Sequence, residues 1–285
     1  MALVALIAVT AVWGVTFVQV KDAVAIYPLF AFLAVRYAIA TGTLAIAGAP
    51  RVRSLGRPGL AAGGVIGILL GLGIGLQTAG LERTTVSSTG FITGLYVVLT
   101  PLFGLALFGT RVGLEVWLGV VLSVTGLAML SGVHVGSTAG DLLVLASTAA
   151  QALQILMVER YASRFDAIAL TLVEMATCCV GFVAIAIALG DLSLPRGWTV
   201  WGALIVTGIF ASALAYLIQI WAQRRLSAAR IALIFALETV WAGFFGYVLD
   251  GDRLGWLGWG GCALILAAIV LAEPAAAKAL RRFVP

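Results

Sequence analysis

The chain has 285 residues, of which 62% are hydrophobic and only 10% are charged. Soluble domains carry about 25% charged residues, so this composition excludes an ordinary soluble protein and indicates a membrane protein. The formal net charge is +5, but the basic residues are placed as topology signals, and no nucleic-acid partner is expected.

Ten apolar stretches follow one another along the chain, each near the roughly 20 residues that a helix needs to cross a bilayer. They lack the ten-residue alternation of barrel strands, so we predict an all-α polytopic membrane protein with ten transmembrane helices. The first stretch has no basic leader and is interrupted by Trp13, Thr16 and Gln19, so it is interpreted as a retained span rather than a signal peptide. The stretches are 2–20, 28–47, 60–80, 86–108, 113–132, 140–158, 167–189, 198–222, 228–249 and 254–272.

The basic residues favour one orientation in the lipid bilayer. With ten spans both chain ends lie on the same side, and twelve of the 17 basic residues fall on that side. Lys21, Arg83, Arg196 and Arg253 fall on the other side, and Arg36 lies within a span. Because basic loops remain on the cytoplasmic side, both termini are predicted to be cytoplasmic, in a bacterial-type inner (plasma) membrane.

Polar positions recur at an offset of 138 residues, and this divides the spans into two sets of five. The offset relates Trp13 to Gln151, Thr16 to Gln154, Arg36 to Glu174 and Thr100 to Glu238. An odd number of spans per half predicts two inverted repeats around a central cavity, the architecture of many secondary transporters. The predicted units are a first repeat at 1–132, a linker at 133–138, a second repeat at 139–272 and a cytoplasmic tail at 273–285.

Within the spans, polar residues gather on single helix faces. In span 86–108, Thr89, Thr93, Tyr96 and Thr100 form one stripe at helical spacing. Such faces are costly in lipid, so they should turn inward and line a cavity; the alternative is hydrogen bonding between helices, worth about 0.6 kcal/mol per contact. The candidate substrate-binding residues are Trp13, Thr16, Gln77, Thr78, Thr93, Tyr96, Thr100, Gln151, Gln154, Tyr216, Gln219, Glu238 and Trp241.

Small residues and one proline predict local backbone features. Span 60–80 carries a glycine at every fourth position from Gly63 to Gly75, which favours close packing of another helix. Ala203, Thr207, Ala211 and Ala215 repeat this pattern in span 198–222. Pro101 removes one helical hydrogen bond, so a kink or break is expected there, either as a packing accommodation or as a gate hinge.

Three charges lie inside spans. Glu238 would cost at least about 2.5 kcal/mol if ionised in lipid, so it either binds a substrate amine, takes up a coupling proton, or joins helices as a neutral acid. Arg36 and Glu174 are interpreted as structural charges that either pair with each other or neutralise different groups. Cys178, Cys179 and Cys262 have no metal-ligand spacing, and His134 is expected in a solvated loop, so no metal or cofactor is predicted.

Several short motifs, in order, together with Arg36 in span 28–47, resemble the EamA family of the drug/metabolite transporter superfamily. They are Ala11-Val12-Trp13-Gly14, Ala79-Gly80-Leu81-Glu82-Arg83-Thr84-Thr85, Leu99-Thr100-Pro101-Leu102-Phe103, Trp221-Ala222-Gln223-Arg224-Arg225-Leu226-Ser227-Ala228 and Leu237-Glu238-Thr239-Val240. The chain is most similar to the YddG-type exporters of aromatic and other amino acids.

The resemblance implies ten-helix exporters with a cavity lined chiefly by the first, third, fourth, sixth, eighth and ninth spans. The second and seventh spans, which carry Arg36 and Glu174, would lie outside it. The chain departs from the family at Thr239, where proline is usual, so the kinks of the two halves are expected to be asymmetric.

These features predict a secondary transporter that exports aromatic or neutral amino acids and related small metabolites by alternating access. The site offers aromatic surfaces, which also attract cations, so efflux of cationic or quaternary-ammonium drugs is the alternative. A membrane-embedded enzyme is disfavoured, because the single histidine and the absence of an aspartate-rich motif leave little for catalysis. Coupling to protons is left open by the sequence.

Overall fold

The computed structural model describes residues 2–131, 139–245 and 255–272. The predictions for the linker 133–138, the tail 273–285, His134 and Arg253 lie outside these residues. The described part is helical, and it contains seven segments long and apolar enough to cross a membrane, together with two shorter apolar helices. One of the seven, Leu29–Leu81, is 53 residues long and folds as two helices, with a turn that ends at Gly56 (φ 58°), a conformation that favours glycine.

The helices agree with the predicted stretches to within a few residues at most of their ends. The first helix is the main exception, because it continues six residues beyond the predicted end at residue 20. The first half contains α1 (Ala2–Ile26), α2 (Leu29–Val52), η1 (Arg53–Leu55), α3 (Gly56–Leu81), α4 (Val86–Gly94), α5 (Tyr96–Phe108) and α6 (Leu114–Ser131). The second half contains α7 (Ala139–Ala162), α8 (Ala167–Leu189), α9 (Trp198–Ile205), η2 (Val206–Leu214), α10 (Ala215–Gln223), α11 (Ala228–Phe235), α12 (Leu237–Phe245) and α13 (Trp256–Ala272).

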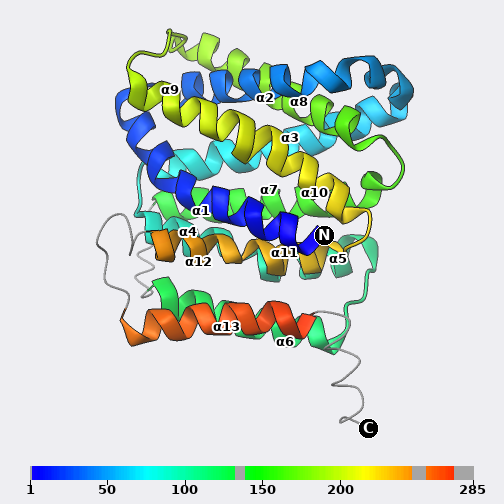
Figure 1. Cartoon of the computed structure of the whole chain (residues 1–285), viewed down its shortest axis with the longest axis vertical. Helices are drawn as coiled ribbons and strands as arrows, with labels where there is room; N and C mark the ends of the chain where they lie inside the picture. Colours follow the sequence, from blue (N-terminus) through cyan, green and yellow to red (C-terminus); the bar gives the residue numbers. More distant parts are fainter. Residues whose placement is uncertain (1, 132–138, 246–254, 273–285) are drawn as a thin grey trace.

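The two halves pack mainly against each other rather than within themselves. Helix α2 packs on α8 at one end of the molecule, and α6 packs on α13 at the other end (Figure 1). Between these pairs, α1 contacts α12 and α10, while α7 contacts α4, α5 and α3. If each helix is replaced by the helix at the same place in the other half, the contacts of α1 with α10 and α12 become those of α7 with α3 and α5. The packing pattern therefore has the two-fold character that the repeat predicts.

The glycines of α3 bring it close to α8. A Cβ atom added at Gly63 would lie 2.7 Å from Val173 Cγ1, and one added at Gly67 would lie 2.6 Å from the carbonyl oxygen of Glu174. Real Cβ atoms do not approach so closely, so only glycine allows the two backbones this separation. The predicted close packing along this face is confirmed.

Two helices are interrupted at related places. Helix α4 ends at Gly94 and α5 begins at Tyr96, while α11 ends at Phe235 and α12 begins at Leu237. The first interruption lies six residues before Pro101, which sits inside α5, so the expectation of a break at Pro101 itself is corrected. Val98 N and Leu99 N both donate to the carbonyl of Leu95, and this shared acceptor closes a tight turn upstream of the proline.

The expected asymmetry between the halves does not extend to the presence of a break, because both halves have one. In the second half the helix breaks at Ala236 although Thr239 stands where proline is usual. The Thr239 hydroxyl donates to the carbonyl of Ala236 at 2.7 Å, and its backbone N–H donates to the same oxygen at 3.3 Å. These bonds replace the regular helical pattern with a three-residue turn, so a threonine accompanies the break that proline would favour.

The segment η2 (Val206–Leu214) is a π-helix in the middle of the long helix Trp198–Gln223. The stripe Ala203, Thr207, Ala211 and Ala215 predicted close packing here but not the change of helix type. A Cβ atom added at Gly208 would lie 2.8 Å from Ile39 Cγ2, so α2 passes very near this segment. Short π-helical segments are frequent at functional sites, and this one borders the cavity described next.

Candidate functional site: a central cavity

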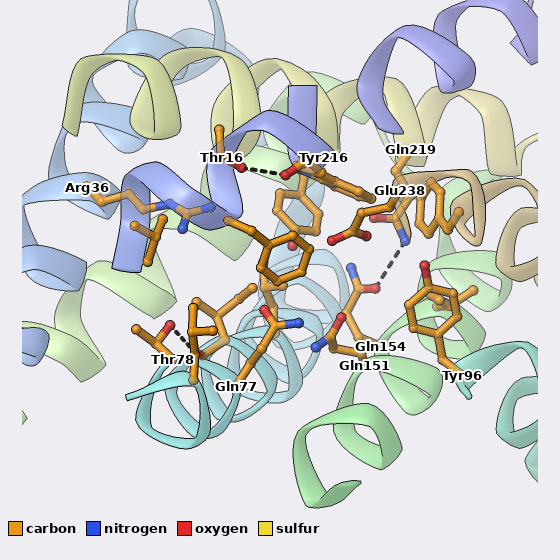
Figure 2. Close-up of a pocket in the computed structure, with 18 residues that line it drawn as sticks. Thr16, Arg36, Gln77, Thr78, Tyr96, Gln151, Gln154, Tyr216, Gln219 and Glu238 are labelled. Carbon is orange, nitrogen blue, oxygen red and sulfur yellow. Dashed lines mark hydrogen bonds between the residues drawn. The ribbon is translucent and has the colours of Figure 1, made fainter. Parts of the chain in front are cut away.

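A cavity lies between the two halves, walled by helices from both (Figure 2). Its walls come from α1, α3, α7 and α10, with single contributions from α2, α5, α11 and α12. The lining is a mixture of aromatic, aliphatic, amide and hydroxyl groups with one arginine and one glutamate. It consists of Trp13, Thr16, Phe17, Val20, Arg36, Leu70, Ile74, Gln77, Thr78, Leu81, Tyr96, Gln151, Gln154, Ile155, Tyr216, Gln219, Phe235 and Glu238.

Aromatic rings form one part of the cavity wall. The ring of Trp13 contacts that of Phe235 edge-on, with centroids 4.8 Å apart, and lies 5.6 Å from that of Tyr216. Phe235 in turn contacts Tyr96 at 6.4 Å. The indole N–H of Trp13 donates to the carbonyl of Ala211 at 2.8 Å, within the π-helical segment. These contacts fix the indole and join α1, α5, α10 and α11 through one aromatic cluster.

Four residues form a hydrogen-bonded chain along another part of the wall. Gln154 Nε2 donates to Glu174 Oε1 at 2.8 Å, and Gln154 Oε1 accepts from Gln219 Nε2 at 3.0 Å. Gln219 also donates to Gln223 Oε1 at 3.0 Å, and Gln223 donates to the carbonyl of Ile155 at 2.8 Å. Glu174 does not itself line the cavity, and it is connected to the cavity wall by its hydrogen bond from Gln154. Gln223 was not singled out from the sequence, although its position four residues after Gln219 places it on the same helix face.

The remaining hydroxyl and amide groups are partly satisfied by local bonds. Gln77 Nε2 donates to Thr93 Oγ1 at 2.9 Å, so Thr93 lies behind the wall and supports Gln77 from α4. Thr16 and Thr78 donate to carbonyls of their own helices, at Trp13 and Ile74. The Nε2 group of Gln151 has no hydrogen-bond partner within the described part of the chain. It is therefore available to a ligand in the cavity.

Arg36 occupies a different place from the one expected. Its Nε donates to Ser212 Oγ at 2.9 Å, and its guanidinium lies 5.6 Å from the ring centre of Tyr37. Arg36 and Glu174 thus have different partners, and Arg36 lines the cavity. The expectation that the second span lies outside the cavity is corrected, because the close approach at Gly208 brings α2 alongside the π-helical segment.

Three other predicted residues lie away from the cavity. Thr100 and Pro101 border a separate hollow near the ends of α5 and α11, together with Arg111, Glu159 and Ser227. Trp241 contacts Phe244 and Phe245, with ring centres 6.0 Å apart in each case, and its Cβ lies against Gly14. Helical spacing placed Thr100 on the face of Tyr96 and Trp241 on the face of Glu238, but the breaks at Leu95 and Ala236 change the register of those faces.

Two of the three cysteines, Cys178 and Cys179, contact neighbouring helices. Cys178 is buried and its Sγ contacts the carbonyl of Gly67 at 3.1 Å. Within the described residues, no group of three or more His, Cys, Asp or Glu side chains is arranged to hold a metal ion.

A helical protein with many membrane-spanning segments and an amphipathic cavity between its halves belongs to the class of membrane transporters. Both halves match the model of the EamA-like transporter family, at residues 1–132 and 138–272, and the chain belongs to this family. It is therefore a multi-pass membrane transporter with a small-molecule substrate, and its family comprises transporters rather than enzymes.

Two known proteins illustrate the similarity. A protein of Archaeoglobus fulgidus described as an uncharacterized transporter is 30% identical over 271 residues, which cover 95% of this chain and 83% of the relative. A solved crystal structure superposes with a TM-score of 0.79 at 19% identity, and covers 100% of this chain and 99% of the other. The second comparison shows a shared fold.

Proposed function

We propose that the protein is a secondary transporter that exports aromatic and neutral amino acids, and related small metabolites, by alternating access. The observation that carries the proposal is the composition of the cavity wall. Aromatic rings, amide groups (among them the Gln151 nitrogen, which has no hydrogen-bond partner within the described residues) and one charge of each sign face one space between the two halves. Apolar walls with a few polar anchors suit a small solute that has a hydrophobic side chain and a polar head.

The architecture that fits this function is ten membrane crossings, in two inverted repeats of five. We place the first repeat at 1–132 and the second at 139–272, with 133–138 as linker and 273–285 as a cytoplasmic tail. The contact pattern between the halves supports this arrangement, because the main contacts of α1 with α10 and α12 have counterparts in those of α7 with α3 and α5. In such a transporter the halves exchange conformations around a central site.

The residues that line the cavity support an assignment of roles. Trp13, Tyr96 and Tyr216 would contact an aromatic or aliphatic side chain, and Gln77, Gln151, Gln154 and Gln219 would bind polar groups. Thr16 and Thr78 add hydroxyl oxygens at the wall, and Glu238 supplies a carboxyl group. Thr93 would act indirectly, by orienting Gln77.

The cavity also suggests which side of the membrane it faces. Apart from Trp13 near the middle of α1, its lining residues on α1 and α3 lie in the C-terminal halves of those helices, from Thr16 and from Leu70 onward. With cytoplasmic termini, those halves lie toward the outside. The aromatic cluster and the chain of glutamines then close the cavity toward the cytoplasm, as in an outward-facing state of the cycle.

Efflux of cationic drugs is the second candidate, because Glu238 and the aromatic rings would attract a cation. Arg36 in the same wall opposes it, since a like charge in a site of low dielectric is unfavourable. Competition in proteoliposomes separates the two substrate classes. Unlabelled phenylalanine should reduce uptake of labelled phenylalanine, and methyl viologen at the same concentration should not. Uptake of labelled methyl viologen that phenylalanine leaves unchanged would instead support drug efflux.

A further inference from the structure

We propose that Arg36 and Glu238 bind the two ends of one zwitterionic substrate, with Arg36 contacting its carboxylate and Glu238 contacting its ammonium group. This inference rests on the proposed transport of amino acids and assigns the orientation of the substrate in the cavity. It also gives Arg36 a role in substrate recognition that its position on the second span did not predict.

Arg36 is a buried cation whose neighbours are neutral. Only 6% of its surface is exposed; its Nε donates to the hydroxyl of Ser212, its guanidinium lies beside the ring of Tyr37, and it forms no ion pair within the described part of the chain. A guanidinium has five N–H donors, and the bond to Ser212 uses the one on Nε. The edge formed by the two Nη groups therefore remains for an anion, and a carboxylate can accept two parallel bonds there.

Glu238 is the complementary group. It is 8% exposed, lines the same cavity, and has neither a hydrogen bond nor an ion pair of its side chain within the described residues. It follows the break at Ala236, in the first turn of α12, so its carboxyl group projects where the helix is interrupted. A buried carboxylate without a partner is costly, and a substrate ammonium group would relieve that cost.

The two charges face the cavity from different elements and different halves. Figure 2 shows Arg36 reaching the cavity from α2 on one side and Glu238 from α12 on the other, with aromatic side chains drawn between them. A direct ion pair between the two is absent from the described structure. Each charge is thus left to an occupant of the cavity, and a solute with one charge of each sign matches both.

Ser212 is the positioning residue in this arrangement. It lies in the π-helical segment and is fully buried, and its hydroxyl oxygen accepts the hydrogen bond from Arg36 Nε. Because that bond fixes Nε, it orients the planar guanidinium and thereby the edge that receives the carboxylate.

The test compares phenylalanine with two analogues that each lack one charged end. Phenethylamine lacks the carboxylate and 3-phenylpropionate lacks the ammonium group. Inhibition constants are measured against uptake of labelled phenylalanine into proteoliposomes. Arg36→Gln should raise the inhibition constants of phenylalanine and 3-phenylpropionate by about tenfold to a hundredfold and leave that of phenethylamine unchanged. Glu238→Gln should raise the inhibition constants of phenylalanine and phenethylamine by a similar factor and leave that of 3-phenylpropionate unchanged.

Controls keep the test independent of folding. Arg51→Gln removes an arginine whose ion pair with Asp166 lies away from the cavity, so all three constants should stay as in the wild type. Arg36→Lys keeps the charge but loses the two-pronged contact, and should give an intermediate loss for phenylalanine. If Arg36→Gln does not yield folded protein, the thermal stabilisation of Arg36→Lys by each compound replaces the transport measurement.

The outcomes separate this inference from the proposed function. Equal losses for all three compounds in the Arg36 variants would mean that Arg36 is only structural, and would overturn the inference while leaving amino acid transport intact. The same holds if Glu238→Gln weakens 3-phenylpropionate as much as phenethylamine. Absence of phenylalanine uptake by the wild-type protein would overturn both.

Discussion

At the residue scale, the side chain of Gln154 joins helices of the cavity wall through hydrogen bonds. It donates to a buried carboxylate on α8 and accepts from an amide on α10, so one side chain joins three helices. The second carboxylate oxygen of Glu174 already lacks a hydrogen-bond partner in the described structure. The carboxylate therefore depends on Gln154 for the bond that offsets its burial.

We expect Gln154→Leu to destabilise the protein. The substitution leaves both oxygens of Glu174 without a donor, and an unsatisfied buried group costs about 1–3 kcal/mol, or more when it is charged. Gln151→Leu is the matched control, because Gln151 lies three residues away on the same helix and its amide nitrogen has no partner. Thermal unfolding in detergent should show a clear decrease for Gln154→Leu and little change for Gln151→Leu. Equal decreases would contradict the role of the hydrogen-bonded chain.

The sequence predicted most of the polar residues of the cavity wall, because a polar side chain within an apolar span is costly in lipid and therefore faces the protein interior. The predicted positions of Thr100 and Trp241 were wrong, because the prediction assumed one regular helix through Leu95 and another through Ala236, where the helices are in fact interrupted. It also assigned Arg36 to the frame, because the side chain lies on a span without a polar stripe. The π-helical segment that brings Arg36 to the cavity left no periodic signal in the sequence.

At the element scale, the packing of α3 on α8 depends on missing side chains. The backbone of α3 approaches α8 so closely at Gly67 that a Cβ atom would lie 2.6 Å from both Glu174 O and Thr177 Cβ. Gly64, on another face of the same helix, has no atom within 4 Å of such a position. The position of Gly67 therefore excludes a side chain, whereas that of Gly64 has room for one.

Gly67→Ala should separate α3 from α8 and lower the thermal stability, because overpacking a fitted contact costs about 1–3 kcal/mol. Gly64→Ala should have no such effect, since the added methyl group meets open space and alanine favours the helix. The comparison is made by thermal unfolding of the two purified variants under the same conditions. A larger loss for Gly64→Ala than for Gly67→Ala would show that the helices do not pack along this face.

The breaks in the two long helices show where element boundaries are set by hydrogen bonds rather than by composition. Pro101 was a visible signal, yet the interruption occurs at Leu95, one turn and a half earlier. Thr239 gave no such signal, yet its hydroxyl bonds to the carbonyl at the break. The presence of the spans could be predicted from hydropathy, whereas these turns depend on local bonds that similar sequences also make within regular helices.

At the scale of the whole molecule, the side to which the cavity opens can be measured with single cysteines. In a background where Cys178, Cys179 and Cys262 are replaced by alanine, Gln77→Cys should react with a membrane-impermeant thiol reagent added from outside. Ser227→Cys, at the start of α11 on the predicted cytoplasmic side, is the matched control. It should react only with reagent that is present on the cytoplasmic side of the membrane. Phenylalanine should protect Gln77→Cys and leave Ser227→Cys unaffected. Reaction of Gln77→Cys from the inside alone would contradict the outward-facing assignment.

The central claim is that a zwitterionic amino acid passes through the cavity between the two halves. Counterflow tests this claim most directly: proteoliposomes loaded with unlabelled phenylalanine are diluted into a trace of labelled phenylalanine, with and without a pH gradient. We expect transient accumulation of label above that in empty liposomes, strongly reduced in Arg36→Gln and retained in Arg51→Gln. Accumulation that occurs with internal methyl viologen but not with internal phenylalanine would contradict the account.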